Sequence, residues 1–98
     1  MKKVHEPITP GEILLTEFLE PLGISQYRLA QATGLPQTRI SLIVRGKRAI
    51  TTETALRLSK ALGVDDRFWI NIQTDYDLEV ERDLHSYELS KVTALVAS

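Results

Sequence analysis

A short stretch around a glycine turn constrains the fold of this chain more than any other feature of its sequence. Ser25 is a favoured helix N-cap, and Gly34 suits the positive φ at which many helices end. Beyond the glycine, Ile40 and Ile43 fall on one face of a second helical pattern. Ala30 provides a site where the two helices can cross, because a larger side chain would push them apart. The spacing predicts two short helices joined by a tight turn.

Two short helices with this turn match the helix-turn-helix arrangement, from about residue 25 to residue 45. A helical hairpin with no role in DNA binding could show the same spacing by chance. The charge of the segment favours the first interpretation, because phosphate groups attract clustered cations. Between residues 39 and 48 the chain carries four cations and no acid, namely Arg39, Arg45, Lys47 and Arg48.

Helical signals also flank this motif. They predict five helices, running from Thr9 to Pro21, Ser25 to Gly34, Pro36 to Gly46, Thr51 or Thr52 to Gly63, and from Asp65 or Asp66 onward. The first is expected to end at Pro21, because a proline ring clashes with the preceding helical turn. No segment alternates with a period of two. The chain is therefore predicted to be all-α, and its length fits one domain of residues 1–98.

The net charge of −1 conceals a division along the chain. Residues 1–63 hold nine Lys or Arg and five Asp or Glu, whereas residues 64–98 hold three and eight. The last part, from about residue 77 to residue 98, forms an acidic C-terminal extension. A chain divided in this way suggests two surfaces with different partners, although an ordinary solvated surface is the other interpretation.

The second helix of the motif is the candidate reading helix. On a helical wheel its apolar residues Ile40 and Ile43 point one way, and a polar, cationic face points the other. Glutamine can pair with adenine, arginine with guanine, and leucine can contact a thymine methyl. Base readout in the major groove is therefore expected from Gln37, Thr38, Arg39, Ser41 and Leu42. Gln37 and Thr38 could instead cap the helix, and Leu42 could be an ordinary surface leucine.

Phosphate contacts are expected from a second group of residues. The cations lie at the end of the reading helix and in the loop after it, where flexible side chains suit phosphate oxygens. One further member lies at the start of the preceding helix, where amides attract anions. The group consists of Gln26, Arg45, Lys47 and Arg48.

The fifth helix carries large apolar residues at helical spacing, Trp69, Ile72 and Tyr76. Such a stripe is most often part of a core. It could also form the seam of a homodimer, in which two-fold symmetry places two reading helices about 34–36 Å apart, one turn of DNA. Both interpretations are open at this stage.

Catalysis and metal binding find no support in the sequence. The chain has no cysteine, two histidines (His5 and His85) and no glycine-rich phosphate loop, so we expect neither an enzyme nor a bound cofactor or metal. His85 and Asp83 are two residues apart and do not face each other on a helix. No apolar run reaches the ~20 residues of a membrane span. The lack of cysteine fits a reducing cytoplasm.

The stretch SQYRLAQATGLPQTRISLIVRGKRAITTETALRLSKALGV resembles the Cro/C1-type (XRE) helix-turn-helix family. Gln26 and Gln37 match the two glutamines that phage repressors of this family place at the starts of the paired helices. The flanking segments HEPITPGEILLTEFLEPLGIS and RFWINIQTDYDLEVE look like those of HigA-type antitoxins, also labelled VapI. The first of these segments carries extra residues inside the HPGE-like motif of that group.

The resemblance implies a lambda-repressor-like fold of five helices with a short C-terminal extension. It implies a homodimer that binds a palindromic operator in its own promoter and represses its toxin–antitoxin operon. It also implies a cognate toxin, a small basic ribonuclease of the RelE-like type that cleaves mRNA, and the acidic extension would suit such a partner. A stand-alone phage-type repressor without a toxin would explain residues 25–63 equally well but leaves the flanking segments unexplained.

Overall fold

The first helical rod begins at Thr9 because the Thr9 side chain closes its first turn. In the computed structural model, which describes residues 6–97, Thr9 Oγ1 accepts a hydrogen bond from the Glu12 amide at 3.1 Å. Pro10 occupies the first helical position, where a missing N–H costs nothing. The rod consists of α1 (Pro10–Ile13), the π-helical segment η1 (Leu14–Leu19) and α2 (Glu20–Leu22).

The rod does not end at Pro21, so that prediction is wrong. It continues to Leu22 and ends at Gly23, whose φ is 66°. The reason is the change of register in η1, where the Glu20 amide donates to the Leu15 carbonyl, five residues back. Pro21 therefore lies in the first turn of a new α-helical segment. First-turn amides have no partner within a helix, so a proline is tolerated there.

Of the remaining helices, two begin at the side-chain caps that the sequence predicted, and three begin without a side-chain cap. In chain order, the remaining helices are α3 (Gln26–Thr33), α4 (Gln37–Val44), α5 (Thr52–Leu62), α6 (Phe68–Leu84) and the short α7 (Ser86–Ser90). Ser25 caps α3 through the Arg28 amide, and Thr51 caps α5 through the Thr54 amide. Residues 6–97 contain no strand, and the prediction of an all-α fold is confirmed.

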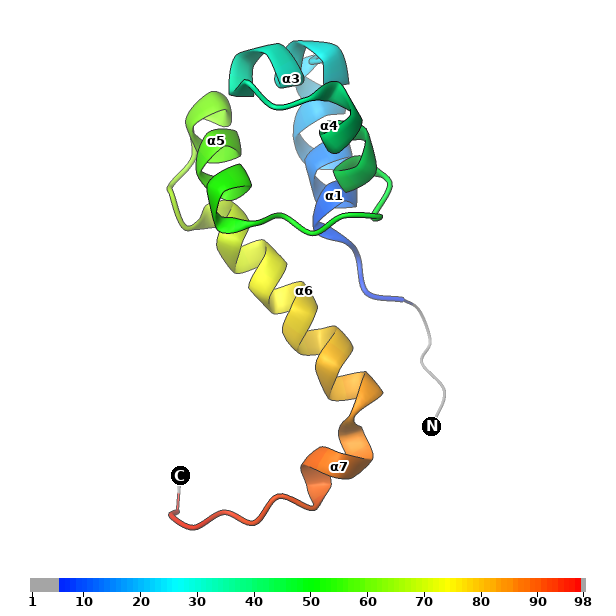
Figure 1. Ribbon diagram of the computed structural model, residues 1–98, viewed down its shortest axis with the longest axis vertical. Coiled ribbons are helices and arrows are strands. Elements are labelled where there is room, and N and C mark those ends of the chain that lie inside the picture. The colour runs from blue at the N-terminus through cyan, green and yellow to red at the C-terminus, as the bar shows by residue number, and fades with distance from the viewer. Residues whose placement is uncertain (1–5, 98) are drawn as a thin grey trace.

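Helix α6 begins at Phe68 without a side-chain cap, as α4 and α7 also begin without one. Asp65, a predicted cap, instead accepts a hydrogen bond from the Arg67 amide at 2.8 Å in the turn before the helix. The helix then passes Asp77 without a break and runs to Leu84. The acidic extension is thus partly a continuation of α6. Figure 1 shows that residues 78–97, here called the C-terminal arm, project away from the other helices.

Three aromatic rings join the first rod to the start of α6. Phe18 and Trp69 have ring centroids 5.2 Å apart, and Phe68 lies 5.1 Å from Trp69 and 5.6 Å from Phe18. Trp69 is 0% exposed within the single chain, so its side chain cannot lie in a dimer seam, and that part of the seam prediction is wrong. The buried core contains Leu14, Leu19, Leu29, Ala30, Leu35, Ile40, Ile43, Ile50, Ala55, Leu58 and Trp69.

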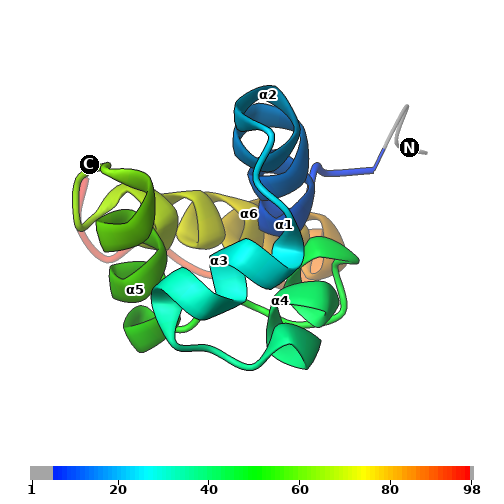
Figure 2. The same cartoon turned by 90° about the horizontal axis from the view of Figure 1, so that it is seen from above.

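The first rod and α4 meet at a glycine. Gly11 is buried, and a Cβ added there would overlap the carbonyl oxygen of Ile43 and lie 2.6 Å from its carbonyl carbon. The two backbones are therefore in direct contact at the last turn of α4. Figure 2 shows the rod rising beside α3 and α4, with α5 and α6 completing the bundle. Only glycine allows this approach, which places α4 against α1.

The Gly11→Ala substitution is expected to lower the free energy of unfolding by about 3 kcal/mol or more, because a methyl group must displace backbone rather than a flexible side chain. Urea unfolding followed by circular dichroism measures this loss.

Gly23→Ala is the matched control. Its φ of 66° makes an alanine strained by about 1–2 kcal/mol, but an added Cβ there has open space around it. Equal losses in the two variants would contradict a close contact at Gly11.

Candidate nucleic-acid interface

The turn between α3 and α4 is held by hydrogen bonds from three directions. Gly34 ends α3 with a φ of 75°, and its amide donates to the Ala30 carbonyl at 2.9 Å. The buried Thr33 hydroxyl donates to the Leu29 carbonyl at 2.8 Å. From α5, Arg57 Nη1 donates to the Thr33 carbonyl at 2.7 Å. The end of α3, from which the turn to α4 departs, is therefore held both by its own helix and by α5.

The reading helix α4 has one face fixed in the core and one face open. Ile40 is 0% exposed and Ile43 is 1% exposed. Gln37 and Thr38 are exposed at the start of the helix, and the next residue, Arg39, is half-buried. Ser41 and Leu42 are also half-buried. The five predicted readout residues thus all lie on α4, and the most open positions are in its first turn, from which a recognition helix reaches base edges.

The loop between α4 and α5, residues 45–51, carries the exposed cations and is called the cationic loop below. Arg45, Lys47 and Arg48 are all exposed. Arg45 Nε lies 3.4 Å from the Ser41 carbonyl oxygen, a weak contact that leaves the charge accessible. In the described part of the chain, none of these three cations has a carboxylate within ion-pair distance.

Arg57, unlike the cations of the loop, has its charge satisfied by partners within the chain that the structure describes. Its Nη2 lies 3.0 Å from Glu53 Oε2, while Nη1 is bound to the turn after α3. The cationic loop differs because no carboxylate among residues 6–97 pairs with its positive charges. Such charges suit an external anion, and a row of phosphates is the anion that fits a row of cations.

Gln26 is the first residue of α3 and is half-buried. It borders a surface hollow at the end of the first rod, together with Leu15, Glu20 and Ser25. Ser25 Oγ accepts the Arg28 amide, which leaves earlier amides of the helix available to an anion. The position of Gln26 at a helix start agrees with the expected phosphate contact. That contact stays a prediction.

The two other predicted seam residues are placed differently from Trp69. Ile72 and Tyr76 are half-buried on α6 and border one surface hollow with Ile8 and Ile13. Both side chains are thus partly accessible. The seam prediction stands for these two positions as an untested prediction.

Sequence reasoning missed two residues that shape the interface. Arg57 gave no local signal, because its partner carbonyl lies 24 residues away. Gln73 is a buried polar residue on the same face of α6 as Trp69. A polar residue on an apolar stripe is a usable signal, because buried amides need partners.

Other kinds of site find little support in the structure. Within residues 6–97, no group of three or more His, Cys, Asp or Glu side chains is placed to hold a metal ion. His85 Nε2 lies 3.3 Å from Glu81 Oε1 on the surface of the C-terminal arm, while His5 lies outside the described residues. In the same part of the chain, no helix has the length and apolar character needed to cross a membrane.

Comparisons with known proteins agree with this geometry. A family model described as "Helix-turn-helix" matches residues 15–69. The virulence-associated protein I of Dichelobacter nodosus is 47% identical over 83 residues, which cover 84% of this chain and 77% of the relative. Antitoxin HigA-1 of Vibrio cholerae is 37% identical over 97 residues, which cover 99% of this chain and 91% of that protein.

A solved structure extends the comparison to the fold. The structure of the Pseudomonas aeruginosa antitoxin HigA with the higBA promoter superposes with a TM-score of 0.86 at 33% identity, and the match covers 93% of this chain and 100% of that one. The chain belongs to the XRE-type helix-turn-helix family, a family of DNA-binding regulators and not of enzymes, and within it to the HigA-type antitoxins.

Proposed function

We propose that this protein binds an operator in the promoter of its own operon and represses transcription there. The observation that carries the proposal is the arrangement of α4, whose inner face is fixed by Ile40 and Ile43 while its first turn is open. Exposed cations with no carboxylate partner in the described chain follow directly in the cationic loop. The related HigA was solved with its promoter, which supports the same use of this surface. A DNA-binding role also favours a cytoplasmic location.

The two groups of residues have separate roles in this proposal. Gln37, Thr38 and Arg39 reach base edges from the first turn of α4, with Ser41 and Leu42 beside them further along the helix. Arg45, Lys47 and Arg48, with Gln26 at the start of α3, contact phosphates on either side. Base contacts provide specificity, whereas phosphate contacts set the register without reading sequence.

The double substitution Gln37→Ala/Arg39→Ala is expected to weaken binding to the protein's own promoter by about 30-fold or more, because each bidentate base contact contributes about 1–3 kcal/mol of discrimination. Binding to scrambled DNA should change much less. Fluorescence anisotropy at two salt concentrations measures both.

Arg48→Ala is the matched control, because it removes a cation from the same surface but outside the reading helix. It should weaken binding to both DNAs alike and reduce the slope of log K against log salt by about 0.9. Equal binding of the wild type to promoter and scrambled DNA would contradict operator recognition.

We also propose that the protein acts as a homodimer whose seam runs from Ile72 and Tyr76 into the C-terminal arm. Contiguous exposed apolar side chains, which the arm carries, are typical of association sites. A symmetric dimer would present two copies of α4 to a palindromic operator. The arm exposes seven large apolar side chains, namely Leu78, Leu84, Tyr87, Leu89, Val92, Leu95 and Val96.

Multi-angle light scattering at micromolar concentration is expected to give twice the mass of one chain. The double substitution Leu84→Asp/Leu89→Asp should shift the protein towards monomer, because it places charges in the proposed seam. Asn71→Asp/Thr74→Asp adds the same charge at exposed positions of α6 outside the arm and should leave the dimer intact. A monomeric wild type would rule out this dimer.

The antitoxin role of the family leads to a final proposal, that the protein neutralises a cognate basic ribonuclease toxin of the RelE-like type. The acidic surface that would meet such a toxin lies on α6 and the arm, where Asp75, Asp77, Glu79, Glu81 and Asp83 are exposed. Complementary charge speeds encounter and excludes wrong partners. Co-purification with the product of a neighbouring reading frame that encodes a small basic protein tests this role, and failure to bind that product would contradict it.

A further inference from the structure

Gln73 is a buried amide whose contacts connect α6 to the cationic loop. The residue is 6% exposed, and the other buried residue of α6 is Trp69. Gln73 Oε1 accepts a hydrogen bond from the Ile50 amide at 2.8 Å, and Gln73 Nε2 donates to Asp77 Oδ1 at 2.9 Å. Both ends of the buried amide are therefore satisfied, one of them by a residue 23 positions away.

The Ile50 amide marks the far end of the cationic loop. At the near end, the Lys47 amide donates to the Leu42 carbonyl at 2.8 Å. Within residues 48–50, the Ile50 amide is the one backbone group for which the described structure has a hydrogen bond. Arg48 thus lies between two anchored residues, Lys47 and Ile50, and the second is held by Gln73 as well as by its own buried side chain.

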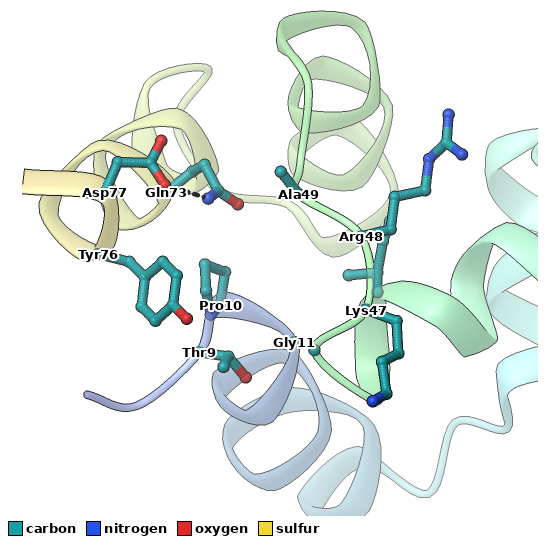
Figure 3. A pocket seen from close by; sticks show the side chains of 11 residues that line it. Thr9, Pro10, Gly11, Lys47, Arg48, Ala49, Gln73, Tyr76 and Asp77 are labelled. Atoms are coloured by element: carbon teal, nitrogen blue, oxygen red, sulfur yellow. Dashed lines mark hydrogen bonds between the residues drawn. The ribbon is translucent and has the colours of Figure 1, made fainter. Parts of the chain in front are cut away.

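A surface hollow brings these groups together. Its lining includes Lys47, Arg48, Ala49, Gln73 and Asp77. Figure 3 shows Gln73 and Asp77 on α6 beside the loop at Ala49, whereas the Arg48 side chain extends away from α6. Gln73 therefore binds the backbone of the loop and leaves its cations accessible to an external anion.

We propose that Gln73 is a positioning residue for phosphate binding, which holds the backbone of the cationic loop so that Lys47 and Arg48 meet DNA already ordered. This inference rests on the proposed operator-binding function. A loop that is ordered only on binding loses conformational entropy at that moment, and a loop already held loses less. Asp77 orients the amide, because a carboxylate accepts only from its NH2 group and so turns Oε1 towards Ile50.

An exchange of donor and acceptor tests this role in the full-length protein. Gln73→Glu keeps an oxygen for the Ile50 amide but removes the donor and places a second carboxylate against Asp77. Gln73→Glu/Asp77→Asn restores the pair, because the introduced asparagine can donate to the introduced carboxylate. The double variant has the same net charge as the wild type. Thr74→Glu is the matched control, since it adds the same charge at an exposed neighbour on α6.

Gln73→Glu is expected to bind both promoter and scrambled DNA about tenfold more weakly than Thr74→Glu. Its slope of log K against log salt should be smaller by about 1–2, which corresponds to one or two lost phosphate contacts. The double variant should regain affinity and slope close to those of the wild type. Thermal unfolding is followed in parallel, because a merely structural role lowers the folded fraction and leaves the salt slope unchanged.

Two results would overturn the positioning role. One is a Gln73→Glu variant with the affinity and salt slope of Thr74→Glu, and the other is a double variant no better than the single one. If Gln73→Glu does not fold, Gln73→Met replaces it, because methionine fills a similar volume without these hydrogen bonds; normal binding by that variant would equally overturn the role. A wild-type protein that fails to bind its promoter would contradict the proposed function instead.

Discussion

The contact between the backbones of Gly11 and Ile43 is the constraint on which the rest of the structure depends. Without a side chain at position 11, the first turn of the rod lies directly against the last turn of α4. This contact fixes the end of the reading helix, from which the cationic loop departs. Gln73 then holds the loop again at Ile50. The surface proposed to meet DNA is thus supported from behind by the first rod and by α6, and its side chains remain free to bind.

Those features that depend on neighbouring residues were predictable from the sequence. Thr9, Ser25 and Thr51 each cap the helix that they were expected to begin, because a cap is a contact across three residues. The inward positions of Ile40 and Ile43 follow from helical period alone, and both are buried. The division of charge was also visible in the sequence. In the folded chain, the α3–α4 pair and the acidic arm lie at opposite ends of the molecule (Figure 1).

The features that the sequence could not predict depend on contacts between distant segments, or on which residues cover the apolar face of a helix. Pro21 was expected to end the first helix, and only the change of register in η1 explains why it does not. Periodicity put Trp69 on an apolar face but could not distinguish a core from a seam, and the rings of Phe18 and Phe68 cover it. A local pattern could have marked Gln73 as a buried polar residue, but its role depends on a partner 23 positions away, which no local pattern identifies.

The most direct test of operator recognition by a symmetric dimer is hydroxyl-radical footprinting of the wild-type protein on its own promoter. Two copies of α4 in successive major grooves should protect two segments whose centres lie about 10–10.5 base pairs apart, on one face of the duplex. That pattern would support both the reading role of α4 and the dimer that pairs its two copies. A single protected segment, or protection spread evenly without this spacing, would contradict the account.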